Sequence, residues 1–175
     1  MTISDTVLEI GYGAFYKNKS LKKLVISESV TKMGEVAFSG CSALSDVTFS
    51  DSLDKIGSTA FWGAGFTSID LPDSVTTIGG GAFMDCTSAK SLHLPKWLKT
   101  LGGVAFAGCT ELTSVVIPKK LTTVDATYTY YNGWTTTWKL TGVFNKCTLL
   151  KTASFEKGPR WDMRISLKTA RVWKE

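Results

Sequence analysis

A short phrase ending in Ala-Phe recurs along the chain at a nearly constant interval. It reads Ile-Gly-Tyr-Gly-Ala-Phe at residues 10–15 and Ile-Gly-Ser-Thr-Ala-Phe at residues 56–61. The closing phenylalanines, with that of a diverged sixth copy, are Phe15, Phe38, Phe61, Phe83, Phe106 and Phe144. The first five stand 23, 23, 22 and 23 residues apart. This period predicts a solenoid, because one such unit cannot bury its apolar side alone and must stack on its neighbours.

Each unit carries further apolar positions after its phenylalanine. In the fifth unit these positions are Cys109, Leu112, Val115 and Ile117. The alternation of the last two predicts a short strand with those side chains pointing inward. The third unit is one residue shorter, and we place the missing residue in the turn between Ala64 and Phe66. We therefore expect a mainly β solenoid of about six units of 22–23 residues, with short strands joined by turns or 3-10 segments.

The repeat pattern resembles that of a known family. Residues 112–124 follow the pattern Leu-x-x-Val-x-Ile-Pro-x-x-Leu-x-x-Val, and residues 74–86 read Ser-Val-Thr-Thr-Ile-Gly-Gly-Gly-Ala-Phe-Met-Asp-Cys. Together they resemble the BspA-like leucine-rich repeats of bacterial surface proteins, over roughly residues 3–155. The resemblance implies adhesion or contact with a protein ligand, at the cell surface or after secretion.

Length and composition agree with one leucine-rich repeat domain over residues 1–175, of which 43% are hydrophobic. Within it we expect the repeats to end near residue 155 and a C-terminal cap to occupy residues 156–175. No run of 18 apolar residues is present, so membrane insertion is not expected. The N-terminus shows no secretion signal, which leaves either a segment of a longer surface protein or a cytoplasmic chain.

The four cysteines occupy one equivalent position in their units. They are Cys41, Cys86, Cys109 and Cys147, and Ala64 takes the same position in the third unit. This exchange with alanine favours small, buried core side chains. A disulfide between adjacent units, Cys86 with Cys109, stays open as an alternative. Zinc is disfavoured because no closely spaced cysteine pair exists and His93 is the only histidine, so we expect neither metal nor cofactor.

His93 and Asp70 are candidates for contact with a partner on the open face of the strands. His93 lies between Leu92 and Leu94, so strand alternation points it outward, in a row that also contains Asp70. A catalytic histidine would need an oriented nucleophile and an oxyanion site, and the repeats offer neither. We therefore expect no catalytic residue and no enzyme activity.

The repeat is interrupted before its sixth phenylalanine. Residues 127–138 read Thr-Tyr-Thr-Tyr-Tyr-Asn-Gly-Trp-Thr-Thr-Thr-Trp, which predicts an inserted β-hairpin with a two-residue turn at Asn132-Gly133. That turn pairs Thr129 with Thr136 and Tyr128 with Thr137. One face would then carry Tyr131, Trp134 and Trp138, and the other Tyr128 and Tyr130.

Exposed aromatic residues on this hairpin suit a protein partner or a sugar ring. The hairpin could equally cover the end of the stack as a lid. The sequence therefore predicts a protein-recognition or adhesion module, with a carbohydrate-binding module as the alternative. Residues 151–175 hold seven Lys and Arg against three acids, but the arginines alternate with apolar residues, which favours a charged protective edge over nucleic-acid binding.

Overall fold

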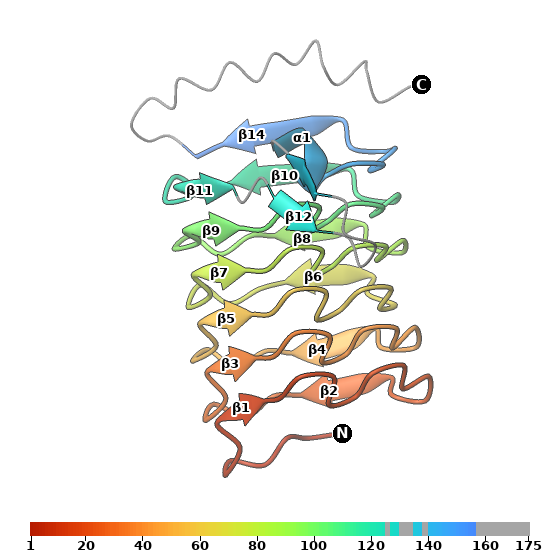
Figure 1. Cartoon of the computed structure of the whole chain (residues 1–175), viewed down its shortest axis with the longest axis vertical. Coiled ribbons are helices and arrows are strands. Elements are labelled where there is room, and N and C mark those ends of the chain that lie inside the picture. The colour runs from red at the N-terminus through yellow and green to blue at the C-terminus, as the bar shows by residue number, and fades with distance from the viewer. Residues whose placement is uncertain (125–126, 130–134, 138–139, 157–175) are drawn as a thin grey trace.

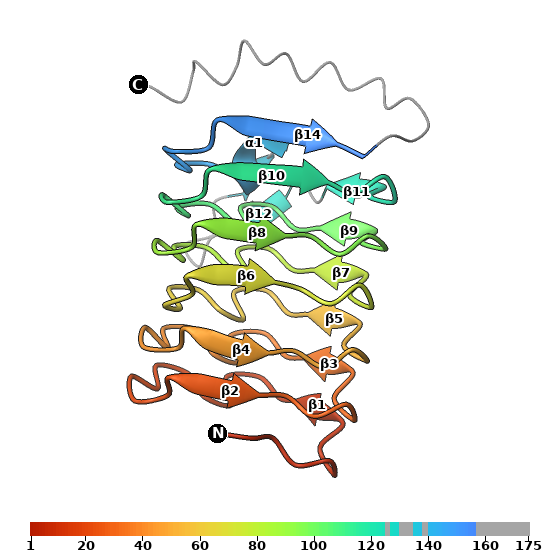
Figure 2. The same ribbon diagram turned by 180° about the vertical axis from the view of Figure 1, so that it is seen from behind.

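The protein is a stack of rungs, each formed by one circuit of the chain (Figure 1). This computed structural model describes residues 1–124, 127–129, 135–137 and 140–156. Every complete rung contributes a two-residue strand, a turn that contains the Ala-Phe phrase, and a second short strand on another side of the coil (Figures 1 and 2). The predicted β solenoid is thereby confirmed.

The two-residue strands form one continuous parallel sheet of six strands. They are β1 (Glu9–Ile10), β3 (Lys32–Met33), β5 (Lys55–Ile56), β7 (Thr77–Ile78), β9 (Thr100–Leu101) and β11 (Thr123–Val124). Equivalent residues of successive rungs pair, as Ile10 does with Met33 and Ile56 with Ile78. In the first five strands the second residue is buried, so this sheet lines one side of the core.

The second strand of each rung lies on the other long side of the stack. These strands are β2 (Lys23–Val25), β4 (Asp46–Thr48), β6 (Ser68–Asp70), β8 (Ser91–His93), β10 (Ser114–Ile117) and β14 (Thr152–Phe155). Their middle apolar residues point inward; Ile69 and Val115 are buried between exposed neighbours, and Leu24 is buried between exposed Lys23 and partly buried Val25. This confirms the predicted alternation. The strands form three separate parallel ladders, β2 with β4, β6 with β8, and β10 with β14, and no continuous sheet.

The repeated phenylalanines form a stacked column through the core. Neighbouring rings from Phe15 to Phe144 have centroids 4.9–5.7 Å apart and are nearly parallel. Phe83 is fully buried between Phe61 and Phe106, whereas Phe15 at the start of the column is only partly buried. The phrase that sets the sequence period is thus also the phrase that fills the core.

The cysteines form a second column beside the phenylalanines, and all four thiols are free and buried. Each thiol donates to the carbonyl oxygen of a phenylalanine in the preceding rung, as Cys86 does to Phe61 at 3.4 Å and Cys147 to Phe106 at 3.2 Å. The expectation of small core side chains is confirmed. The alternative of a Cys86–Cys109 disulfide is wrong, since each sulfur is directed to a backbone carbonyl.

Two kinds of glycine shape the turns. Gly34, Gly57, Gly79 and Gly102 pass so close to the preceding rung that an added β-carbon would meet its backbone within 3 Å. Gly63 instead adopts a left-handed conformation with φ +66° and has open space around it. The first kind is required by close packing, whereas the second is favoured by the backbone angle, which Lys17 and Asp85 also adopt at the equivalent position.

The insertion forms an antiparallel hairpin of β12 (Thr127–Thr129) and β13 (Thr135–Thr137), followed by one helical turn, α1 (Leu140–Val143). The predicted register is wrong by one residue, because Thr129 pairs with Thr135 and Tyr128 with Thr136. A two-residue turn at Asn132-Gly133 would have paired Thr129 with Thr136. The observed pairing belongs to a connection with an odd number of residues.

The remaining predictions for the C-terminal part fall mainly outside the described residues. Tyr130, Tyr131, Trp134 and Trp138 lie there, as does the expected cap apart from Glu156. Glu156 extends the last ladder, since its backbone N–H donates to the carbonyl of Ile117 at 3.0 Å.

Candidate partner-binding surface

The strands β2, β4, β6, β8, β10 and β14 present two rows of outward side chains, which we call the strand face. The first row is Lys23, Asp46, Ser68, Ser91, Ser114 and Thr152. The second row is Val25, Thr48, Asp70, His93, Val116 and Ser154. All of these side chains are exposed except Val25, which is partly buried. Within each ladder the members of a row are register partners, and the pairing of Asp70 with His93 agrees with the row that the repeat predicts.

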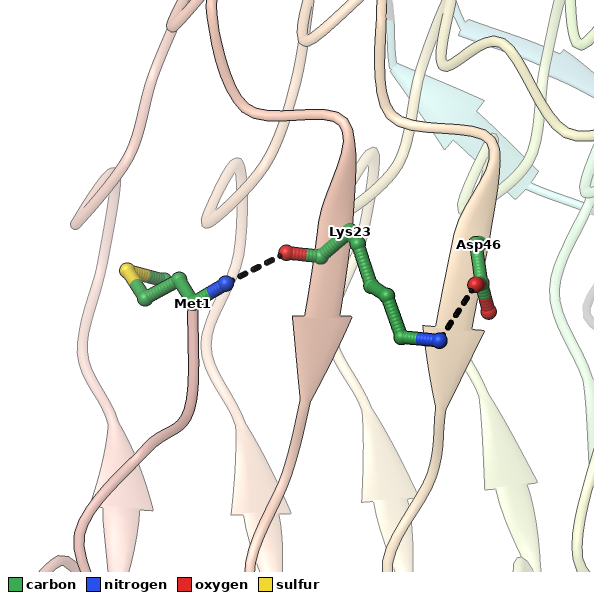
Figure 3. A network of polar contacts seen from close by, with 3 residues as sticks. All are labelled: Met1, Lys23 and Asp46. Carbon is green, nitrogen blue, oxygen red and sulfur yellow. Dashed lines mark hydrogen bonds and ion pairs between the residues drawn. The ribbon is translucent and has the colours of Figure 1, made fainter.

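Polar contacts connect neighbouring rungs along the first row. The ammonium of Lys23 lies 2.8 Å from a carboxylate oxygen of Asp46, and the hydroxyls of Ser68 and Ser91 are 2.8 Å apart (Figure 3 shows the lysine pair). The backbone carbonyl of Lys23 also accepts from the amino group of Met1 at 2.8 Å. Exposed ion pairs of this kind contribute about 0–1 kcal/mol, so they order the surface more than they stabilise the fold.

Asp70 and His93 stand side by side in the second row. They are register partners on β6 and β8, and both are exposed. The structure therefore brings together the two strand-face residues that the sequence singled out. Tyr128 lies elsewhere, because β12 is in front of the stack in Figure 1 and behind β8 in Figure 2.

The strand face is divided where β4 ends its pairing with β2 and β6 begins its pairing with β8. No backbone hydrogen bond joins β4 to β6, and Figure 2 shows these two strands farther apart than β2 and β4. Three aromatic rings crowd the core behind the gap. Phe49 and Phe66 both pack edge-on against Phe61, with centroids 5.7 and 5.3 Å away. Their volume holds the two rungs apart on this side.

A hollow of about 320 Å³ opens in this division. Its walls are Val47, Thr48, Phe49, Asp51, Asp70, Leu71 and Pro72. Asp70 thus belongs both to the second row and to the rim of the hollow. Sequence reasoning missed Phe49 and Asp51. The available signals were a phenylalanine at a position that holds Ile or Leu in four of the other five units, and the shortened spacing from Phe61 to Phe83.

Further aromatic residues are exposed away from the strand face. Trp62, which directly follows the Ala-Phe phrase of its rung, donates from its indole nitrogen to the carboxylate of Asp85 at 2.9 Å. The ammonium of Lys120 lies over the ring of Trp97, 5.6 Å from the ring centroid. Both indoles are between two fifths and one half exposed. Sequence reasoning did not single them out, because single tryptophans inside regular repeats carry no spacing signal.

The described residues offer little reactive chemistry. Burial raises the pKa of Cys86 and of Cys147 to about 12, so both thiols stay protonated at neutral pH. Burial likewise raises the pKa of Cys41 and Cys109. Among the residues that the structure places, no cluster of His, Cys, Asp or Glu has the composition of a metal site. In the same residues, no helix has the length and apolar character to cross a membrane.

Comparison with known proteins agrees with this architecture. Residues 8–136 match six copies of the BspA type leucine-rich repeat region. The chain belongs to the BspA-type leucine-rich repeat family. Proteins built from these repeats generally serve as surface adhesion or recognition modules. No curated protein is similar enough to the chain to match it.

Solved leucine-rich repeat structures have the same fold. The T. pallidum protein TpLRR is 27% identical, with a TM-score of 0.74 over 88% of this chain and 68% of its own. A Bacteroides ovatus leucine-rich repeat protein is 29% identical, with a TM-score of 0.63 over 85% of this chain. The pneumococcal vaccine antigen PcpA, at 24% identity and a TM-score of 0.73 over 90% of this chain, shares the fold. The BspA-type chain spans 41% and 40% of the last two proteins.

Proposed function

We propose that this BspA-type chain is a non-enzymatic recognition module that binds a protein partner through its strand face. The main support for this proposal is the pair of exposed rows, which run across successive rungs of a stack with a tightly packed core. An extended surface of this kind matches the length of a macromolecule better than that of a small substrate.

The composition of the strand face supports a protein as the ligand. Its first row is rich in hydroxyl groups, with Ser68, Ser91 and Ser114 on three consecutive strands. Small hydroxyl side chains let a partner backbone come close and can donate or accept hydrogen bonds. Asp70 and His93 add polar groups that can fix its orientation. We propose Tyr128, Tyr130, Tyr131, Trp134 and Trp138 of the hairpin as a second contact.

Family membership supports a location at the bacterial cell surface, where adhesion modules act. We further propose that the rungs, the hairpin and the residues after 155 form one binding domain. A carbohydrate ligand is the second candidate function, and the hairpin aromatics Tyr131, Trp134 and Trp138 favour it because tryptophan and tyrosine stack on sugar rings.

The test is a capture experiment with two matched variants. Ser91→Arg puts a large charged side chain at the centre of the strand face, and Thr123→Arg puts the same side chain on an exposed position of the six-stranded sheet. Both are used as bait for extracellular proteins, beside the intact chain and a chain lacking residues 127–138. We expect a saturable partner that Thr123→Arg retains and Ser91→Arg loses.

Equal capture by Ser91→Arg and Thr123→Arg would rule out the strand face. Loss of capture only on hairpin deletion would move the site to the hairpin. An oligosaccharide array read by tryptophan fluorescence separates the second candidate, since a saturable sugar that quenches the signal would establish carbohydrate binding instead.

A further inference from the structure

We propose that the hollow between β4 and β6 binds a basic side chain, an arginine, of the protein partner. The proposal rests on the recognition function above and names the chemistry of one contact. Its basis is the shape of the hollow, its uncompensated charge and its apolar walls.

The hollow is wide enough for a single long side chain. At about 320 Å³ it has the volume of roughly ten water molecules at about 30 Å³ each. It lies on the strand face itself, between Thr48 and Asp70 of the second row. A partner that lies along the rows would therefore pass directly over its opening.

Two carboxylates at the hollow have no lysine or arginine partner among the described residues. Asp51 and Asp70 lie in no ion pair there, whereas Asp46 on β4 is paired with Lys23, and Asp73 is paired with Lys96. The carboxylate of Glu28 adds negative charge beside Asp51, because it accepts from the Asp51 backbone N–H at 2.9 Å. This negative region stands out on a chain with a net charge of +5, and it attracts a cation.

The walls select a cation that carries a hydrocarbon stem. Val47 and Phe49 are partly exposed, and Leu71 and Pro72 continue the apolar lining on the other side. Long basic side chains bury their methylene groups on such surfaces and leave the charged end at the rim. The part-exposed ring of Phe49 adds a cation–π partner, and a planar guanidinium suits both the ring and a carboxylate. A bare metal ion would find no cluster of three ligating side chains in the described part of the chain.

The experiment titrates the full chain with N-acetyl-arginine amide and follows backbone amide signals by NMR. N-acetyl-citrulline amide, which has nearly the same shape and no charge, is the matched control. We expect saturable shifts confined to residues 47–51 and 70–73, with a dissociation constant on the order of 10 mM for so small a probe. The citrulline compound should bind at least about fivefold more weakly, the scale that a charge contact of about 1 kcal/mol supplies.

Asp51→Asn and Asp70→Asn should each weaken binding of the arginine probe by about two- to fivefold. Both variants should keep the fold intact, because both side chains are exposed and asparagine has the same size as aspartate. Glu111→Gln removes an exposed charge outside the hollow and should leave binding unchanged. The proposal is overturned if the two probes bind equally, if the shifts lie elsewhere, or if neither Asp variant weakens binding. If the captured partner still binds Asp51→Asn and Asp70→Asn fully, the strand-face function stands and this contact fails.

Discussion

Gly57 rests directly on the backbone of Glu35 in the preceding rung, where an added β-carbon would stand 2.5 Å from the Glu35 nitrogen. Gly11 occupies the equivalent position of the first rung and has nothing within 4 Å of such a β-carbon. One repeat position thus occurs in two environments. Substitutions at Gly57 and Gly11 therefore separate the effect of rung contact on stability from the effect of residue type.

Gly57→Ala should destabilise the protein by about 1–3 kcal/mol or more, because rigid backbone must move to admit the methyl group. Gly11→Ala should change stability by less than about 0.5 kcal/mol, since the site is open. Urea unfolding followed by circular dichroism measures both. Equal losses in the two variants would contradict the close packing at Gly57.

Phe83→Ala should cost about 3–5 kcal/mol, because the variant removes a fully buried ring stacked on both sides. Phe15→Ala is the matched control and should cost clearly less, since Phe15 stacks on one ring only and is partly exposed. Thermal and urea unfolding report the difference. A cost below about 1 kcal/mol for Phe83→Ala would refute the stacked core.

Gly63→Ala should destabilise the protein by about 1 kcal/mol although the added methyl group meets no atom within 4 Å. The cost comes from the φ of +66°, which disfavours alanine. Gly63→Asn should recover part of the loss, because asparagine tolerates this conformation. If the alanine and asparagine variants are equally stable in urea, the backbone angle does not determine the stability cost of replacing Gly63.

Stability should fall as pH rises above about 9, because buried thiols keep their protons in the folded state and lose them in the unfolded one. The pKa of Cys86 lies at about 12 in the fold against an ordinary 9.0, so its stabilising effect is complete below pH 9 and lost towards pH 12. Cys86→Ala, which copies Ala64 of the third unit, should flatten this slope. The test is to measure the unfolding free energy of the original chain and of Cys86→Ala at several pH values between 8 and 10. If the two free energies fall with pH at the same rate, the thiol of Cys86 has no such effect.

The stacked core was predictable because every rung repeats the same requirement. Where one unit departs from the pattern, as Ala64 does, the equivalent residues Cys41 and Cys86 of other units still identify the position as a small core residue. The strand face was predictable for the same reason, since alternation about Leu92 places His93 outward whatever surrounds it. Repetition converts a weak local preference into a strong one.

The hairpin register was not predictable from its turn residues. Asn132-Gly133 favours a two-residue turn, but the observed register sets Thr127 opposite Thr137 and Thr129 opposite Thr135. A single inserted hairpin has no equivalent copies to decide between two registers one residue apart.

The hollow escaped prediction because a hydrophobic pattern records polarity and ignores volume. Phe49 satisfies an apolar position as well as the Ile26 or Leu94 found there in other rungs. Its larger ring nevertheless competes with Phe66 for space around Phe61. The resulting separation of β4 from β6 depends on side-chain volume, which the hydrophobic pattern does not record.

The unequal pairing of the two long sides sets where the stack can change its curvature. The six-stranded sheet is hydrogen-bonded along its whole length, whereas the other side is bonded only within its three ladders. Bending stiffness is therefore lowest across the unbonded junctions. The spacing between Asp70 and His93 is set by the backbone hydrogen bonds of the ladder that joins them, whereas the spacing between Thr48 and Asp70 is set by side-chain packing alone.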